Sequence, residues 1–352
     1  MDVIVDDLLK EAQLRKASDL HITVGVAPKC RINGELADML YPALTPADTE
    51  ELIMPMVPQR MKDLLLTNGE VDFSYSISGF GRYRVNVFKQ RGSYAAAIRI
   101  INTNIPGPDM LGLPSSVIGL TNKKRGMVLV TGPTGSGKST TLASMIDIIN
   151  SNQNLHIITL EDPIEYLHKH KKSVVNQREI GLDSLSFSNA LRVILREDPD
   201  VILVGEMRDL ETIEIAITAA ETGHLVFSTL HTIGAVNTVD RIIDVFPPHQ
   251  QQQIRIQLAS VIEGVISQQL IPTINHAGRV AAFEVMLSTP AIRNLIREGK
   301  NHQIASFIQT NKRLGMQTMD DAIFDLYNSG RIGKEQAISF AQDMTTMERK
   351  IN

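Results

Sequence analysis

The segment at residues 132–140, with the sequence GPTGSGKST, constrains this chain more than any other stretch. It follows the apolar run MVLV at residues 127–130 and precedes the helix-like residues 142–146, which predicts strand, glycine-rich loop and helix in that order. In such a loop the backbone N–H groups surround an anion, and the helix directs its positive end at it. The predicted binding site for a nucleoside triphosphate consists of Gly132, Pro133, Thr134, Gly135, Ser136, Gly137, Lys138, Ser139 and Thr140.

Two of these side chains have more specific predicted roles. Lys138 is placed to contact the β- and γ-phosphates, and the Ser139 hydroxyl is a candidate ligand of Mg²⁺. The alternative is a glycine-rich turn with a chance lysine, which the flanking strand and helix disfavour. The expected cofactors are therefore ATP and Mg²⁺.

The composition limits the other classes of function. The chain has 352 residues, enough for two domains, and its net charge of -4 provides no overall positive field for nucleic acid. Cys30 is the only cysteine, which excludes a disulfide framework or a cysteine-rich zinc site. The acidic start lacks the apolar core of a signal peptide, and no run approaches the roughly 18 apolar residues of a membrane helix. We expect a cytoplasmic protein without direct membrane insertion.

The first hundred residues have the pattern of a small mixed α+β domain. A helix is predicted near residues 3–16, and strands are predicted at residues 71–77, 82–88 and 94–101. Residues 102–109 have the composition of a linker, with asparagine, proline and glycine. The predicted division is a domain at 1–104, a linker at 105–113 and a second domain at 114–352.

After the linker, strands alternate with helices. Alternation of this kind is typical of a parallel sheet covered on both faces. From about Pro247 onward the chain has a mostly helical pattern. The strands are predicted at residues 127–131, 156–160, 201–205 and 225–229.

Acidic residues follow two of the predicted strands. Glu161 and Glu165 lie in the run EDPIE after residues 156–160, and Glu206 follows residues 201–205. Ligands of open parallel sheets bind at the carboxyl ends of the strands, where a carboxylate can orient water or help to hold Mg²⁺. The alternative is solvated charge on ordinary loops.

Two histidines flank the predicted strand at residues 225–229. His224 precedes it and His231 follows it, so an extended strand separates them by roughly 23 Å and they cannot share one zinc ion. Ordinary loop histidines remain an alternative for both. We favour His231 as a hydrogen-bonding sensor of the phosphate, and His224 is the weaker candidate for nucleotide contact.

Three arginines lie in the first domain. Arg82 and Arg84 share one face of a strand, and Arg99 lies on the next strand. A solvated strand face is one interpretation. The other is that these side chains are arginine fingers delivered from a second subunit to the γ-phosphate.

Four of these segments resemble the defining motifs of a known family. Residues 132–139, 158–165, 203–209 and 222–231 resemble the Walker A, Asp box, Walker B and His box of the secretion-type hexameric ATPases of type II secretion systems and type IV pili. The resemblance runs from residue 17 to residue 320. Within the family, residues 289–298 are similar to a C-terminal motif of the pilus-retraction branch.

The resemblance implies a fold and an assembly. The expected fold is an N-terminal PAS-like α+β domain followed by a RecA-like P-loop domain with a helical C-terminal region. The expected assembly is a homohexamer in which N-domain arginines complete each site. Glu165 is the favoured catalytic glutamate, Glu161 is the alternative, and Glu206 stands where the family usually has a Walker B aspartate.

The resemblance also implies an activity: a motor ATPase that retracts type IV pili, and so drives twitching motility, through an inner-membrane platform protein. Assembly and secretion ATPases usually carry an extra N-terminal domain and a four-cysteine zinc insertion, for which this chain is too short and has too few cysteines. An accessory retraction ATPase or a DNA-uptake pseudopilus ATPase is an alternative. A RecA-like nucleic-acid motor is a remote one, since only 5% of residues are aromatic and none is tryptophan.

Residues 289–298 predict a helix with two different faces. Thr289 is a suitable cap and Pro290 a suitable first residue. Isoleucine and leucine at residues 292, 295 and 296 are predicted to face the core. Arg293 and Arg297 are predicted to share an exposed face, as solvated charges or as a surface that couples ATP turnover to the pilus machinery.

Overall fold

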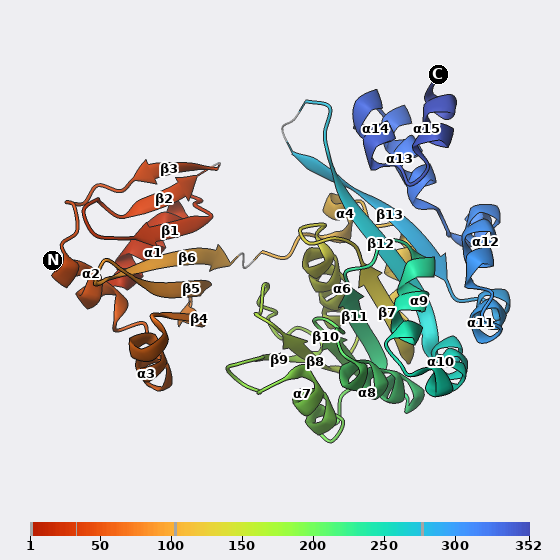
Figure 1. Cartoon of the computed structure of the whole chain (residues 1–352), viewed down its shortest axis with the longest axis horizontal. Helices are drawn as coiled ribbons and strands as arrows, with labels where there is room; N and C mark the ends of the chain where they lie inside the picture. Colours follow the sequence, from red (N-terminus) through yellow and green to blue (C-terminus); the bar gives the residue numbers. More distant parts are fainter. Residues whose placement is uncertain (1–2, 33, 102–103, 276–277) are drawn as a thin grey trace. The chain divides into compact units, whose positions relative to one another are not determined.

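The structure, a computed structural model, describes residues 3–32, 34–101, 104–275 and 278–352. Asn102 and Thr103, which contribute to the linker composition, lie outside these residues. The chain divides into two compact units. Unit one comprises Met1–Asn104 with Glu165–Leu167, and unit two comprises Ile105–Ile164 with His168–Asn352. Figure 1 labels the elements of both.

Unit one is built on an antiparallel sheet with the strand order β3-β2-β1-β6-β5-β4. The predicted N-terminal helix and the three predicted strands are confirmed, with small changes in their ends. The elements of this unit are α1 (Val5–Leu14), β1 (Asp19–Ile22), β2 (Lys29–Ile32), β3 (Glu35–Asp38), α2 (Pro46–Ile53), α3 (Gln59–Asn68), β4 (Glu70–Ile77), β5 (Gly81–Gln90) and β6 (Ser93–Ile101).

Side-chain alternation along β5 fixes which face of this sheet is buried. Tyr83, Val85 and Val87 are buried in the core of the unit. The Tyr83 hydroxyl donates to Gln13 Oε1 on α1 (2.9 Å), and burial raises the pKa of Tyr83 to about 12. The pattern that buries one face of β5 leaves Arg82 and Arg84 on the other.

Unit two contains a seven-stranded sheet with the order β13-β12-β7-β11-β10-β8-β9, in which only β13 is antiparallel to its neighbour. Its strands are β7 (Gly126–Thr131), β8 (His156–Glu161), β9 (Val174–Glu179), β10 (Val201–Val204), β11 (Leu225–Leu230), β12 (Ile262–Pro272) and β13 (Arg279–Leu287). Its α-helices are α4 (Pro108–Leu111), α5 (Ser115–Leu120), α6 (Lys138–Asn152), α7 (Phe187–Ile194), α8 (Leu210–Glu221), α9 (Ala235–Asp244), α10 (Pro248–Val261), α11 (Pro290–Arg297), α12 (Ile304–Thr310), α13 (Met319–Asn328), α14 (Lys334–Phe340) and α15 (Met344–Ile351).

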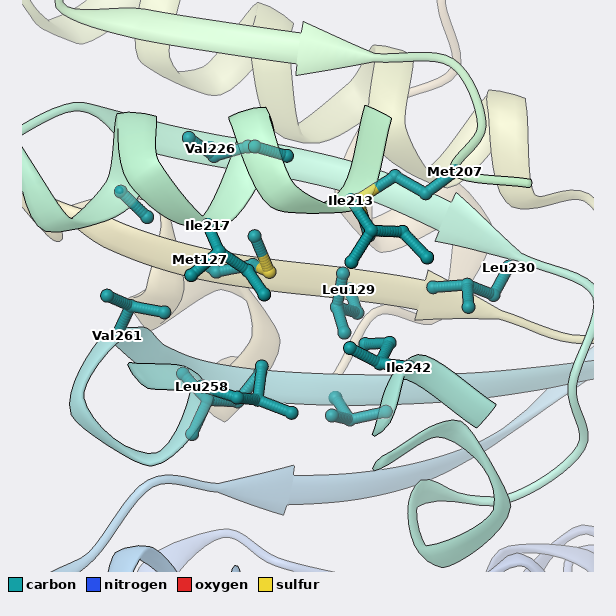
Figure 2. Close-up of a cluster of buried hydrophobic side chains, with 14 of the residues drawn as sticks. Met127, Leu129, Met207, Ile213, Ile217, Val226, Leu230, Ile242, Leu258 and Val261 are labelled. Carbon is teal, nitrogen blue, oxygen red and sulfur yellow. The ribbon is translucent and has the colours of Figure 1, made fainter. Parts of the chain in front are cut away.

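Helices cover both faces of this sheet, and β7 shows why its sequence is continuously apolar. Met127 and Leu129 pack into one core with side chains of α8, α9 and α10, as Figure 2 shows. Val128 and Val130 pack into a second core with side chains of α6. Residues 127–130 are buried on both faces of the sheet and are all apolar, as expected for a central parallel strand. Among the described residues, no helix is long and apolar enough to cross a membrane.

The expectation of mostly helical structure after Pro247 is wrong for residues 262–272 and 279–287. These two segments form β12 and β13, an antiparallel pair that extends the sheet next to β7. Helix α10 ends at Val261 and β12 begins at Ile262, so no turn residue marks the change. The strand β9 was also not predicted; its sequence, VVNQRE, lacks a regular apolar alternation. Residues 105–113, the predicted linker, contain α4.

Candidate active site

The phosphate loop connects β7 to α6 and depends on its glycines. Gly132, Gly135 and Gly137 have φ angles of 142, 78 and 88°, a region that L-residues with side chains rarely adopt. Lys138 Nζ donates to the carbonyl oxygens of Gly132 (2.8 Å) and Pro133 (3.0 Å). The loop thus curls around its own lysine, and the amino terminus of the 15-residue helix α6 adds positive potential.

Gln268 of β12 supports this loop and was missed in the sequence because residues 262–272 were predicted as helical. Its Oε1 accepts from Thr141 Oγ1 of α6 (2.7 Å). A β-carbon on Gly132 would lie 2.2 Å from the Gln268 carbonyl oxygen, and one on Gly137 would lie 2.9 Å from Gln268 Nε2. The two glycines therefore also allow the loop to pack directly against β12.

Four neighbouring parallel strands, β7, β11, β10 and β8, bring the predicted catalytic loops to one edge of the sheet. Their registers place the ends of the strands side by side, with Leu230 opposite Thr131 and Val204 opposite Leu160. The phosphate loop, His231 and Glu206 follow these strand ends, and Glu161 is the last residue of β8. The carboxyl edge of the sheet is therefore the candidate active site, as the strand pattern predicted.

Glu206 lies between two basic side chains. Its Oε1 is 2.7 Å from Arg208 Nε, and its Oε2 is 3.5 Å from His231 Nε2, the outer limit of a hydrogen bond. Glu206 is largely shielded from solvent whereas Arg208 is 72% exposed, so solvent weakens their attraction. The structure thus brings Glu206 and His231 together from different strands.

The two glutamates of the Asp box occupy different surroundings. Glu161 ends β8, and its Oε1 accepts hydrogen bonds from Thr159 Oγ1 (2.7 Å) and Gln177 Nε2 of β9 (3.0 Å). Glu165 is exposed and belongs to the short segment that groups with unit one. A cis peptide bond joins Asp162 to Pro163 between them.

The side chains near the loop fit a magnesium ion carried by a nucleotide. Mg²⁺ prefers oxygen ligands and usually takes only one or two from the protein, the rest coming from water and phosphate. Ser139 in the first turn of α6 and Glu206 offer a hydroxyl and a carboxylate. Within the described part of the chain, no group of three histidine, cysteine, aspartate or glutamate side chains is arranged to hold a metal by itself.

His224 lies at the other end of β11. Its ring Nδ1 is 2.9 Å from the Ala219 carbonyl, and its own carbonyl accepts from Gly126 N at the start of β7. Because β7 and β11 run parallel, this edge is opposite the one that carries the phosphate loop. Within one subunit His224 therefore does not lie at the phosphate edge.

The three arginines of unit one gather on one face of β5 and β6. Arg84 and Arg99 are direct cross-strand partners, and Arg82 lies two residues from Arg84. Arg99 Nε is 3.1 Å from Asp19 Oδ1, and its side chain is 70% exposed. Like charges in directly opposed positions destabilise a sheet, and Asp19, which faces Arg99 from β1, offsets part of this repulsion.

Comparison with known proteins agrees with this architecture. A family described as "Type II/IV secretion system protein" matches residues 114–277. The Pseudomonas aeruginosa type IV pilus retraction ATPase PilT is 48% identical, covering 95% of this chain and 96% of that protein. A crystal structure of the pilus retraction motor PilT with bound ADP superposes with a TM-score of 0.92 at 52% identity, covering 99% and 100% of the two chains. The chain belongs to the PilT-type pilus-retraction ATPases.

Two further relatives are described as proteins of twitching motility or of type IV pili. A twitching motility protein of Neisseria gonorrhoeae is 46% identical over 97% of this chain and 91% of that protein. The type IV pilus ATPase PilU of P. aeruginosa is 40% identical over 98% and 91%. The expected fold class, an N-terminal α+β domain followed by a RecA-like domain with C-terminal helices, is confirmed by the likeness to the PilT structure.

The PilT-like motif at residues 289–298 forms α11 as predicted, but one of its arginines is not exposed. Thr289 Oγ1 accepts from Ile292 N, and Pro290 is the first helical residue. The prediction for Arg293 is wrong: its Nη1 donates to the Ala259 carbonyl (2.8 Å), and its Nη2 pairs with Glu263 (2.7 Å). Arg297, four residues after Arg293 on the same helix, is exposed as predicted.

His168 is a half-buried group of the PilT-like fold that the sequence did not single out. Its backbone N–H donates to Gln177 Oε1 (2.8 Å), the residue that also bonds to Glu161. Its ring Nδ1 is buried without a hydrogen-bond partner among the described residues, and burial lowers the pKa of His168 to about 4.

The depressed pKa of His168 predicts acid sensitivity. Below pH 6.5 the unfolded chain takes up a proton that the folded chain binds only near pH 4, so the free energy of unfolding falls as the pH drops through this range. The full difference is on the order of 3 kcal/mol. We expect His168→Gln to remove this component, as measured by urea unfolding between pH 7 and 4. An exposed control, His249→Gln, should keep it; the same pH slope in all three proteins would contradict the assignment.

Proposed function

We propose that the chain hydrolyses Mg²⁺-ATP as a homohexameric ring on the cytoplasmic face of the inner membrane. The ring would use this energy to retract type IV pili, and so to drive twitching motility, by acting on a platform protein of that membrane. The observation that carries the proposal is the gathering of the phosphate loop, Glu161, Glu206 and His231 at one edge of the sheet. PilT, the relative to which the chain is similar over nearly its full length, is described as a retraction ATPase.

The residues of this edge divide the chemistry among them. The loop N–H groups and Lys138 bind the phosphates. Glu165, or Glu161 in its place, orients the attacking water and accepts its proton. Ser139 and Glu206 would hold the magnesium ion, which would neutralise charge on the phosphate oxygens. His231, next to Glu206, forms the hydrogen bond that distinguishes a γ-phosphate from its absence.

The position of the arginine cluster supports the proposal of a ring, in which one subunit completes the nucleotide site of the next. Arg82, Arg84 and Arg99 lie in the other unit, where three cations are gathered beside one carboxylate, that of Asp19, which leaves the cluster a net positive charge to attract a further anion. We propose that this partner is the γ-phosphate held by a neighbouring subunit, where an arginine typically contributes about 10³-fold or more to turnover.

Mixed rings test this proposal. One variant carries alanine at Arg82, Arg84 and Arg99, and the other carries Lys138→Ala. Each alone should be inactive, whereas mixing them should restore part of the ATPase activity, because an arginine-deficient subunit can be completed by its neighbour. The matched control is a mixture of the arginine variant with a chain that carries all four changes, which can form no competent site.

Two outcomes would count against the proposal. Mixed hexamers, verified by native mass spectrometry, that regain no activity would show that the arginines form only a solvated strand face. We expect no nucleic-acid partner. Stimulation of the wild-type ATPase by DNA would therefore favour the nucleic-acid motor instead. The accessory-ATPase alternative is disfavoured by the lower identity to PilU, 40%, than to PilT, 48%.

A further inference from the structure

The hairpin of β12 and β13 carries two buried polar side chains that the proposed mechanism does not use. Ser267 and Glu284 are direct cross-strand partners, so their side chains project from the same face of the hairpin. Ser267 is fully buried and Glu284 is 6% exposed. Burial raises the pKa of the Glu284 carboxyl, which shows that its charged form is costly here. A buried carboxylate is retained only where hydrogen bonds satisfy it.

Both side chains accept hydrogen bonds from the backbone that follows His231. Gly234 N donates to Ser267 Oγ (2.9 Å), and Ala235 N donates to Glu284 Oε1 (2.7 Å). Ala235 begins α9, and the N-cap residue Gly234 has no side chain with which to cap that helix. The hairpin therefore supplies the missing cap from outside and fixes the end of the short segment that starts at His231.

The same carboxylate also reaches the C-terminal helices. Glu284 Oε2 accepts from the backbone N–H of Met319 (3.3 Å), the first residue of α13. The Gln342 side chain, in the connection between α14 and α15, hydrogen-bonds to Glu284 as well. Asp320 accepts from the backbone N–H of Gln342 (2.7 Å), which ties that connection to the same point. One carboxylate thus accepts from the first N–H group of two helices, α9 and α13, of which α13 also has its own cap, Thr318.

We propose that Glu284 is a positioning residue for ATP hydrolysis, because by capping α9 and α13 together it makes the placement of His231 depend on the C-terminal helices. The inference rests on the proposed role of His231. The phosphate loop is supported separately by Gln268, whose side chain bonds to Thr141. Loss of the Glu284 contacts should therefore slow hydrolysis without weakening nucleotide binding.

The variant Glu284→Gln tests this split. It keeps the side-chain volume but replaces one acceptor oxygen by a donor, so only one of the two helix N–H groups can still be accepted. We expect kcat to fall about tenfold or more, as for a misplaced catalytic group. The Kd of a fluorescent ADP analogue should stay within about twofold of the wild-type value, since nucleotide binding does not use this contact.

Val280→Ala is the matched control. Val280 lies on the same strand and is buried among the C-terminal helices. Its loss should lower the melting temperature, but the kcat per folded subunit should remain that of the wild type. If Glu284→Gln likewise changes only the melting temperature, Glu284 is structural and the inference is overturned. Should Glu284→Gln fail to fold, Ser267→Ala, which removes the neighbouring cap, must show the same loss of kcat at constant ADP affinity.

A double variant separates this inference from the proposed function. If Glu284 acts through His231, Glu284→Gln combined with His231→Ala should have the kcat of His231→Ala alone. Multiplied losses would overturn the route through His231. If His231→Ala itself retains the wild-type kcat, the proposed role of His231 fails and the inference fails with it. If only His231→Ala is impaired, the proposed function stands and the inference on Glu284 alone is wrong.

Discussion

Replacing Lys138 with alanine is expected to lower the ATP turnover of the purified protein by about a hundredfold or more, while the chain still folds. Lys138 provides the positive charge that follows the transferred phosphoryl group, and removal of one such group typically costs about 10²–10³ in kcat. Its Nζ donates to two loop carbonyls, those of Gly132 and Pro133. Water can replace the lysine at the exposed Pro133, whereas the carbonyl of the buried Gly132 loses a donor at a cost of about 1–3 kcal/mol, which the fold should survive.

Phosphate release at saturating ATP measures this effect, and circular dichroism verifies the fold. Lys124→Ala is the matched control, because Lys124 is an exposed lysine just before β7 whose Nζ reaches Gln153 (3.3 Å). That variant should retain wild-type turnover. A Lys138→Ala protein that hydrolyses ATP as fast as the control would show that the phosphate loop has been assigned wrongly.

The second large effect concerns stability: Arg293→Ala is expected to lower the free energy of unfolding by about 2 kcal/mol. Arg293 donates to the Ala259 and Ser260 carbonyls in the last turn of α10 and pairs with Glu263. The positive charge of Arg293 also interacts favourably with the negative end of the helix dipole at the C-terminus of α10. Glu263 keeps a second partner, Lys123 (2.8 Å), which limits the loss.

Arg297→Ala provides the comparison within the same helix. Arg297 is exposed, and such substitutions usually change stability by less than about 0.5 kcal/mol. Urea unfolding distinguishes the two variants: if the dependence of the free energy of unfolding on urea concentration is the same for both, the midpoints compare their stabilities. Equal midpoints would contradict the capping role of Arg293. If the exposed face of α11 couples ATP turnover to the pilus machinery, Arg297→Ala should keep its ATPase activity and lose retraction.

The parts of the site that local sequence patterns define were predictable. A strand, a glycine-rich loop and a helix specify the phosphate loop within 20 residues, because the chain needs those residue types for the turn itself. Strand ends followed by Glu161, Glu206 and His231 could likewise be placed at one edge, because parallel strands share their carboxyl ends. These predictions needed only the order of elements, not their packing.

The parts that depend on packing between distant segments were not predictable. Gln268 and Glu284 are buried polar residues on β12 and β13, and their partners lie 127 and 49 residues away in the sequence. The helical period of residues 289–298 shows which side Arg293 occupies but not that the end of α10 lies beside it. Buried polar groups are set by such long-range partners, so no local pattern could reveal them.

Deleting the gene and imaging the pili tests the central claim, retraction, most directly. Cells without the protein should be hyperpiliated and unable to retract, since assembly would continue unopposed. Expression of the wild-type chain should restore retraction and normal pilus number, whereas Lys138→Ala at the same level should restore neither. Bald cells after deletion would contradict the account, because they would identify the chain as an assembly motor.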